Sequence, residues 1–159
     1  MINKRFLESC SNQLLKAIAV ESKNPKDLKQ LLEFKEEVVY MEVAQNSYTD
    51  KETLTYLYDK YGEKIVTYLA SNDNTAPKVL HQIAIDSDTS IAKMLLENTN
   101  LETATIYFLV DRFMAYKEII KLAIYHPNTS AETLIKISLN YGTLVGEILN
   151  SGKVKLVAK

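Results

Sequence analysis

The 159-residue sequence has no tryptophan, one cysteine, two histidines, three prolines and four glycines. The single thiol, Cys10, excludes an internal disulfide and a cysteine-based metal site, and it favours a reducing compartment. Because glycine and proline are scarce, a turn-rich β fold and a disordered chain are both disfavoured. No apolar run approaches the roughly 18 residues that a membrane-spanning helix needs, and the N-terminus lacks the apolar stretch of a signal peptide. We therefore expect a cytoplasmic protein with no membrane span.

An excess of charge of either sign is also missing. The net charge is −1, so the sequence lacks the basic surplus that is typical of nucleic-acid-binding proteins. The apolar fraction of 47% and the charged fraction of 25% are those of an ordinary globular protein. The length is sufficient for one domain with a substantial core.

What the sequence does contain is a segment that recurs about every 26 residues. One position of this segment is asparagine or histidine, at separations of 26, 26 and 28 residues: Asn46, Asn72, Asn98 and His126. Eight residues later each copy has a leucine or isoleucine: Leu54, Leu80, Ile106 and Leu134. A fixed period in this range indicates an α-solenoid, in which short helix pairs stack on one another.

We accordingly interpret residues 1–159 as a single α-solenoid domain. Residues 1–23 are predicted to form an N-terminal capping helix, residues 24–151 five helical repeats, and residues 152–159 a short basic tail. Each repeat contains two stretches whose apolar residues recur at three- and four-residue steps, which indicates two amphipathic helices. No helix pair can bury its apolar face alone, so neighbouring repeats are expected to share one continuous core.

The ends of the first elements are predicted from the same pattern. In the capping helix an apolar stripe is expected to be buried, with Cys10 as a small hydrophobe: Leu7, Cys10, Leu14, Ala17 and Ile18. The first repeat begins at Asn24, with helices expected at about 27–34 and 36–45, and no turn residue marks the boundary between them. In the later repeats Gly62 and the run Asn140–Gly142 are expected to separate the two helices.

The polar residues of the repeated segment are interpreted as structural. Thr49, Thr75 and Thr129 come just before a helix, where a hydroxyl can accept a bond from a free N–H, so we predict that they are N-caps. Glu52 and Glu132 follow at the spacing of a capping box. The asparagines lie between two helices and are expected to satisfy backbone groups of the turn or of the next repeat, with His126 as a substitute. The alternative is that they line a binding site.

The string (Ala/Leu)-x-Asn-x-x-Thr-x-x-x-x-(Leu/Ile) resembles the leucine-rich repeat variant, a helical repeat found in bacteria. Ile124-Tyr125-His126-Pro127-Asn128-Thr129 is similar too, because that family favours a proline after the Asn position. The resemblance covers residues 24 to 151 and implies a right-handed superhelix. The chain departs from the family in having few of its prolines and in second helices that are long enough to be regular α-helices, so a HEAT-like repeat describes the sequence equally well.

No pattern for catalysis, cofactors or metals is found. His81 and His126 lie far apart without a His or Cys partner at ligand spacing, and the glycines do not form a phosphate-binding loop. Asp86 and Asp88 are better explained by a solvated turn than by paired catalytic carboxylates. We therefore predict that the protein is not an enzyme, and we assign no catalytic, cofactor-binding or metal residues.

Function is expected on the outward positions of the repeats. On the second helices the candidates for partner binding are Lys64, Lys93, Glu97, Lys121 and Tyr125. On the first helices Tyr56 and Phe108 are aromatic residues at positions that the pattern predicts to be exposed, and aromatic residues are enriched in interfaces. Between residues 70 and 111 the sequence contains six acidic residues, including Asp86 and Asp88, but only two lysines.

These features favour a protein-binding scaffold whose partner is unknown. A more specific form of this hypothesis is an immunity or inhibitor protein that blocks a basic toxin with its acidic middle section. The alternative is a HEAT-like module that binds the phosphate backbone of nucleic acids. That alternative needs a continuous basic stripe, and Lys64, Lys93 and Lys121 supply only a sparse one.

Overall fold

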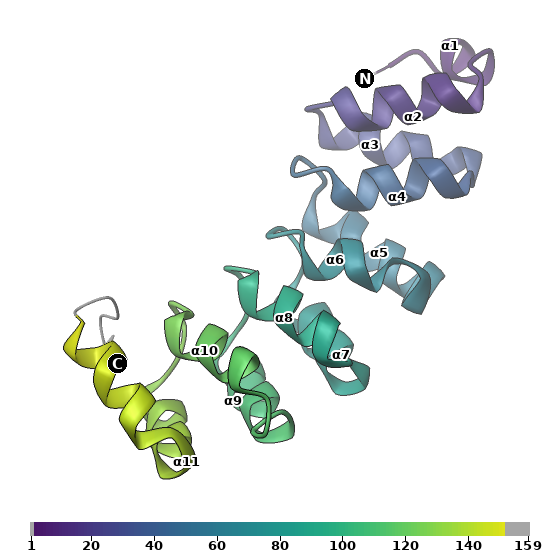
Figure 1. The fold of residues 1–159 in the computed structure, drawn as a ribbon. Coiled ribbons are helices and arrows are strands. Elements are labelled where there is room, and N and C mark those ends of the chain that lie inside the picture. The colour runs from purple at the N-terminus through teal and green to yellow at the C-terminus, as the bar shows by residue number, and fades with distance from the viewer. Residues whose placement is uncertain (1, 152–159) are drawn as a thin grey trace. The chain divides into compact units, whose positions relative to one another are not determined.

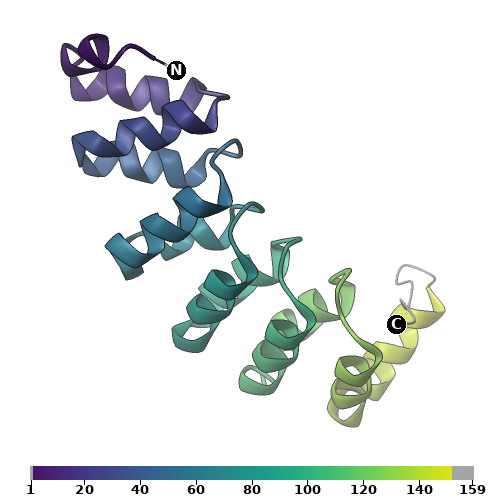
Figure 2. The same ribbon diagram turned by 180° about the vertical axis from the view of Figure 1, so that it is seen from behind.

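A computed structural model describes residues 2–151 of the chain, so the predicted basic tail, 152–159, lies outside the described residues. Every secondary-structure element within the described range is a helix (Figures 1 and 2), which confirms the all-α prediction. The chain divides into two compact units, Met1–Val79 and Leu80–Lys159. The prediction of a single domain is not tested by this division.

The first unit consists of short helices joined by tight turns. Its elements are α1 (Lys4–Glu8), α2 (Asn12–Glu21), α3 (Pro25–Leu31), the 3-10 helix η1 (Leu32–Phe34), α4 (Glu37–Gln45), α5 (Lys51–Tyr61), the 3-10 helix η2 (Gly62–Ile65) and α6 (Val66–Ala70). Helix α4 packs against α2 on one side and α6 on the other. Leu28, Leu54 and Leu69 are among the fully buried side chains between these helices.

The capping helix expected within residues 1–23 is in fact two helices, α1 and α2. The break falls at Ser11, whose side chain accepts a hydrogen bond from the N–H of Leu14 and so starts a new helix. Cys10 lies in the break, half-buried, and its thiol donates to the carbonyl of Phe6.

The predicted stripe of α2 is also wrong, because the helix buries Leu15 and Ala19 and leaves Leu14 and Ala17 exposed. Both faces of α2 carry apolar residues at helical spacing. Periodicity alone could not select the face that packs against α4.

The first repeat begins as predicted but ends without a sequence signal. Asn24 caps α3 by accepting from the N–H of Lys26 at 3.1 Å. The chain leaves η1 through Lys35, a non-glycine residue in the left-handed region with φ 56°. This turn explains why no glycine or proline marks the boundary, and α4 then begins close to the predicted position.

Gly62 ends α5 as predicted, with φ 50° and ψ −126°, a conformation that L-residues with a side chain rarely adopt. A Cβ atom added there would meet nothing within 4 Å, so the effect of a substitution would come from backbone strain and not from a steric clash. We expect Gly62→Ala to lower the free energy of unfolding by about 1–3 kcal/mol, measured by urea denaturation. Gly146→Ala is the matched control: Gly146 is helical and equally uncrowded, so alanine should stabilise by about 0.5–1 kcal/mol. Equal effects at both sites would contradict the argument.

In its described part, the second unit contains α-helices and no 3-10 helix. Helix α7 (Pro77–Asp86) begins in the first unit and is followed by α8 (Thr89–Glu97), α9 (Thr103–Arg112), α10 (Lys117–Tyr125) and α11 (Ala131–Asn150). Helix α10 packs against α8, α9 and α11, and α11 packs against α9.

The repeated apolar positions of the second unit, Leu80, Ile106 and Leu134, are buried. Helix α11 is interrupted at Tyr141, which has the non-helical angles φ −133° and ψ 37°, at the predicted turn.

Candidate functional site

The repeated asparagines join each turn to the repeat before it. The Nδ2 of Asn46 donates to the carbonyls of Ala19 (2.8 Å) and Ser22 (2.9 Å). The Nδ2 of Asn72 donates in the same way to Ala44 (2.8 Å) and Asn46 (3.1 Å). The structural interpretation of this position is confirmed, but the bonded backbone belongs to the preceding repeat and not to the next.

The same side chains also hold their own turn. The Oδ1 of Asn72 accepts from the N–H of Asn74 at 2.9 Å, and the Oδ1 of Asn98 accepts from the N–H of Asn100 at 2.9 Å. One amide thus serves as donor to the previous repeat and as acceptor within its own turn. A side chain with both capacities is needed there, which explains why asparagine recurs.

His126 performs the same two tasks with an imidazole ring. Its Nε2 lies 3.0 Å from the carbonyl of Asn98, and its Nδ1 accepts from the N–H of Asn128 at 3.1 Å. Only the neutral ring with the proton on Nε2 fits both bonds. Burial lowers the pKa of His126, and the hydrogen bond to the Asn98 carbonyl opposes this effect. The substitution of histidine for asparagine at this position is therefore structural, as predicted.

Thr49 and Thr129 do not cap the helices that follow them, so the prediction is wrong at these two positions. Thr49 donates its hydroxyl to the carbonyl of Val43 at 2.5 Å, and Thr75 donates to Leu69 at 2.8 Å. They close the end of the preceding helix, where carbonyls lack partners. The cap of α5 comes one residue later, where Asp50 accepts from the N–H of Thr53.

Thr129 and Ser130 repeat this arrangement before α11. Thr129 donates to the carbonyl of Ala123, and Ser130 accepts from the N–H of Thr133 at 3.1 Å.

We call the repeated residues Asn46, Asn72, Asn98 and His126 the first ladder. A second ladder of amides was not recognised in the sequence. The Nδ2 of Asn74 donates to the carbonyls of Ser47 (2.6 Å) and Thr49 (3.1 Å). The Nδ2 of Asn128 donates to the carbonyl of Leu101 at 2.9 Å. The signal was present, because Asn74, Asn100 and Asn128 all follow the first ladder by two residues. Together the two ladders fix the relative position of successive turns within each unit.

Four of the predicted partner-binding residues share one surface of the second unit. Lys93 and Lys121 each come five residues before the ladder position, and Glu97 and Tyr125 come one residue before it. Because α8 packs against α10 and His126 is bonded to Asn98, equivalent positions on the two helices are neighbours. We call Lys93, Glu97, Lys121 and Tyr125 the exposed row.

The side chains of the exposed row are accessible to a partner. Lys93 and Glu97 are exposed, and Tyr125 is 49% exposed. Lys121 is half-exposed, with its Nζ 3.5 Å from the carboxylate of Glu118. The row therefore presents both signs of charge beside an aromatic ring.

In the first unit Tyr56 is 46% exposed, as predicted. Lys60 donates to its hydroxyl at 2.8 Å and lies 5.2 Å from the ring centres of both Tyr56 and Tyr61. The hydrogen bond to Tyr56 raises the pKa of Lys60. Tyr61 stacks on the buried Tyr40 with ring centres 3.8 Å apart. This contact connects the group of Tyr56, Lys60 and Tyr61 to the core. Lys64 is exposed and lies in η2, the 3-10 helix that directly follows α5.

Phe108 is not the freely exposed aromatic residue that the pattern predicted. It is half-buried, with its ring edge-on to His81 at 5.8 Å between centres. The Nδ1 of His81 lies 3.0 Å from the hydroxyl of Thr105. Packing between neighbouring helices covers a position that the period of a single helix leaves outside.

The two aspartates between α7 and α8 have different environments. Asp88 caps α8 by accepting from the N–H groups of Ser90 and Ile91, each at 2.9 Å. Asp86 is exposed at the end of α7. The turn interpretation is thus supported, and one of the two carboxylates is already engaged within the protein.

The kink of α11 creates a hollow that the sequence did not predict. Its volume is about 290 Å³, and it is lined by Lys117, Asn140, Tyr141, Gly142, Thr143, Leu144 and Glu147. Lys117 comes from the start of α10 and all the others from α11. The hollow carries one charge of each sign, and no convergent set of catalytic groups lies in it.

Within the described part of the chain, no group of three or more metal-binding side chains is found. In the same part no helix has the length and hydrophobicity that crossing a bilayer requires. Comparison of the chain with protein-family models, with curated proteins and with solved structures found no match.

Proposed function

We propose that this chain is a non-enzymatic protein-binding scaffold built as a right-handed α-solenoid of the leucine-rich-repeat-variant or HEAT-like type. The proposal is supported by the 26-residue sequence repeat and by the amides that link successive turns within each unit. Repeat proteins of this kind present extended surfaces made of equivalent positions on successive helices.

The observation that carries the proposal is the exposed row on α8 and α10. Tyrosine is enriched among the residues that dominate binding energy, and Tyr125 stands at the end of α10 with half of its surface open. The bond between His126 and Asn98 holds the two helices in place before any partner arrives. A preorganised surface loses less entropy on binding, which favours this row as the contact surface.

The charges of the exposed row indicate which kind of partner surface would be complementary to it. Lys93 and Lys121 alternate with Glu97, so a protein surface of mixed charge is complementary. The more specific proposal, an inhibitor of a basic toxin, uses the exposed carboxylates of Asp86, Glu97 and Glu102.

A pull-down with quantitative mass spectrometry tests the scaffold. We expect the double variant Tyr125→Ser with Lys121→Glu to bind the recovered partner at least about tenfold more weakly, because a central aromatic anchor and a charge are lost. Tyr48→Ser is the matched control, since Tyr48 is 48% exposed in the first unit. Equal recovery by wild type and the double variant would contradict the proposed surface.

Titration with duplex DNA tests the alternative of backbone binding to nucleic acid. Glu118 and Glu97 lie among the lysines of α8 and α10, which opposes a continuous basic stripe. We expect no binding at physiological salt. Tight binding that weakens steeply as salt rises would instead establish the nucleic-acid function.

A further inference from the structure

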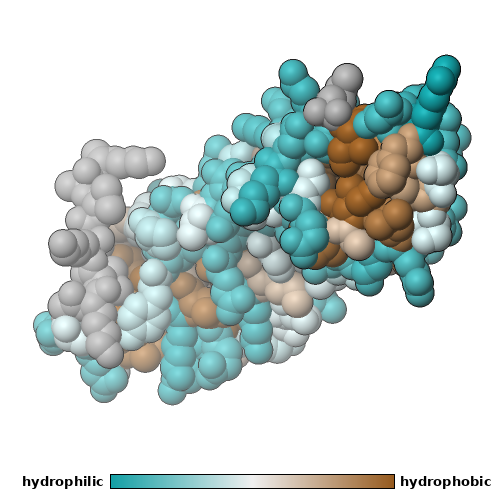
Figure 3. Space-filling view, turned by 90° about the horizontal axis from the view of Figure 1, so that it is seen from above, coloured by the Kyte–Doolittle hydropathy of each residue, from teal (hydrophilic) through white to brown (hydrophobic). Residues whose placement is uncertain are grey.

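The last helix of the second unit exposes an apolar face near its start. Ala131, Ile135 and Leu139 of α11 follow one another at four-residue steps, so they share one side of the helix. Ile135 is 65% exposed, Leu139 is 80% exposed and Ala131 is exposed as well. We call these three residues the terminal face, and Glu132 is the charged residue at its edge. On the side that Figure 3 shows, hydrophilic and neutral residues cover most of the second unit, so such a face is an exception.

In the preceding repeat the equivalent positions are covered by the helix that follows. At the repeat spacing of 28 residues, Ile135 and Leu139 correspond to Tyr107 and Asp111 of α9. Both contact Lys136 of α11: its Nζ lies 3.3 Å from the Tyr107 hydroxyl and forms an ion pair with Asp111.

The repeat before that one shows the same relation. The equivalent positions are His81 and Ile85 of α7. The Nδ1 of His81 lies 3.0 Å from the hydroxyl of Thr105, and the carbonyl of Ile85 accepts from Arg112, so both positions meet α9. At the terminal face no helix of the described residues does this, because α11 is the last of them.

We propose that residues 152–159, which follow α11 in the sequence, fold back and cover the terminal face, with Val154 and Leu156 against Ile135 and Leu139. The end of a helical stack needs either a polar outer face or a cover, and the terminal face is apolar. Residues 153–156 alternate between lysine and an apolar residue. That alternation is typical of an extended segment with one side buried.

The course of the chain favours this segment as the cover. The end of α11 lies on the edge of the second unit that carries the turns before α9 and α11 (Figures 1 and 2). From that edge α11 starts and packs against α9, so a segment that leaves α11 there starts where the next covering helix would start. Eight residues can span up to about 26 Å, and the stretch 131–140 of α11 is about 15 Å long. The segment is therefore long enough to reach the whole terminal face.

The charges fit the same contact. The segment contains Lys153, Lys155 and Lys159 and no acidic residue. Glu132 at the edge of the terminal face has the opposite sign, which favours a basic segment beside it.

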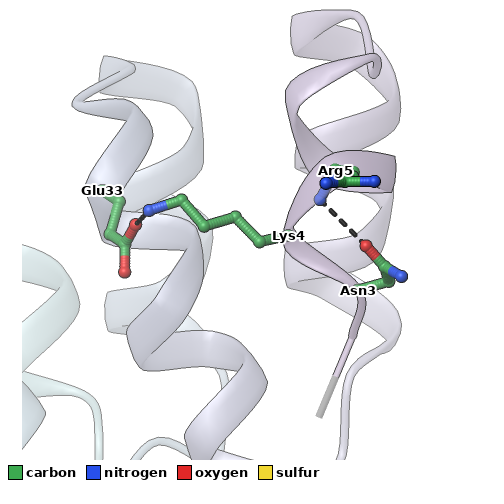
Figure 4. A network of polar contacts seen from close by, with 4 residues as sticks. All are labelled: Asn3, Lys4, Arg5 and Glu33. Carbon is green, nitrogen blue, oxygen red and sulfur yellow. Dashed lines mark hydrogen bonds and ion pairs between the residues drawn. The ribbon is translucent and has the colours of Figure 1, made fainter.

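The N-terminal end of the chain provides a precedent for such a cover. Helix α1 has only five residues, yet its Leu7 is fully buried. Lys4 pairs with Glu33 of η1 at 2.7 Å (Figure 4), and the N–H of Ile2 donates to the carboxylate of Asp27 at 2.8 Å. A short terminal segment with a buried leucine and a paired lysine thus packs against the first repeat, and the proposed contact of residues 152–159 uses the same kinds of side chain.

Thiol labelling of the full chain in a Cys10→Ser background tests the contact. Leu139→Cys places a reporter on the terminal face. We expect a maleimide to label it at least about fivefold faster when Val154→Asp and Leu156→Asp are also present, because the rate follows the fraction of time that the face is uncovered. Glu118→Cys is the matched control, since the side chain of Glu118 is 68% exposed on α10, and its labelling rate should not change. Circular dichroism confirms that each variant is folded.

Ala131→Cys is a second reporter that leaves Ile135 and Leu139 in place, so the test does not depend on the loss of an apolar side chain. Slow labelling that is independent of protein concentration and is abolished by the two aspartates supports the proposal. Equal rates with and without the aspartates at both reporters overturn it. Protection that rises with protein concentration also overturns it, because a second copy of the chain would then be the cover.

Discussion

Replacing Asn72 with alanine is expected to lower the free energy of unfolding by about 3 kcal/mol. The side chain is 5% exposed, donates to the carbonyls of Ala44 and Asn46, and accepts from the N–H of Asn74. Alanine would leave these buried groups without those bonds, and each unsatisfied buried group costs about 1–3 kcal/mol. Urea denaturation followed by circular dichroism measures the change. Asn12→Ala, at an exposed site on α2, is the control and should change stability by less than about 0.5 kcal/mol.

Asn72→Asp separates the donor from the acceptor role. Aspartate keeps an acceptor for the N–H of Asn74 but sets a carboxylate against the carbonyls of Ala44 and Asn46. At pH 7 the loss should therefore exceed that of Asn72→Ala. Acidification should recover part of it, because a protonated carboxyl can again donate. A variant with the stability of wild type at pH 7 would show that the ladder does not stabilise the fold.

The second unit is expected to lose stability as the pH falls below about 6.5, the ordinary pKa of histidine. Burial lowers the pKa of His126 in the folded protein, so in this range the unfolded chain binds more protons than the folded one. Stability from this group is complete above the unfolded pKa and declines as the pH falls through the folded pKa. The geometry gives the reason: a proton on Nδ1 would oppose the N–H of Asn128. Thermal unfolding between pH 5 and pH 8 measures the effect.

His126→Asn provides the decisive comparison. An asparagine can donate to the carbonyl of Asn98 and accept from the N–H of Asn128, as Asn72 does in its own turn, and it does not titrate. We expect its stability at pH 8 to lie within about 1 kcal/mol of wild type, with the acid-dependent loss reduced. His81→Gln controls for the other histidine and should retain the loss. If His126→Asn keeps the full pH dependence, other groups are responsible.

The helices, the inner residues of the repeats and the structural role of the Asn position could be predicted because each depends on spacing along one chain. Leu54, Leu80 and Ile106 are fully buried, and Asn72 bonds to backbone as expected. The predicted caps failed for a different reason. Thr49 and Asp50 are adjacent and both are good N-caps. Which of them caps α5 depends on the carbonyl of Val43, which lies within reach of the Thr49 hydroxyl.

On the candidate surface, too, some exposures followed from the sequence pattern and others depended on packing. Tyr56 and Tyr125 are exposed as the pattern predicted, whereas Phe108 is half-buried against His81. Burial of an outward position depends on the side chain that the neighbouring helix supplies, 27 residues away in this case. The binding role of the exposed row remains a prediction.

By itself, the sequence determined an all-helical chain, its period and the side chains that face inward, because helical periodicity and turn residues act locally. Only the tertiary structure decided the rest. It selected Leu15 and Ala19 over Leu14 and Ala17 as the buried face of α2, because α4 packs on that side. It also decided that the repeated amides bond to the preceding turn, since a donor is satisfied by whichever carbonyl the packed neighbour brings within 3 Å or so.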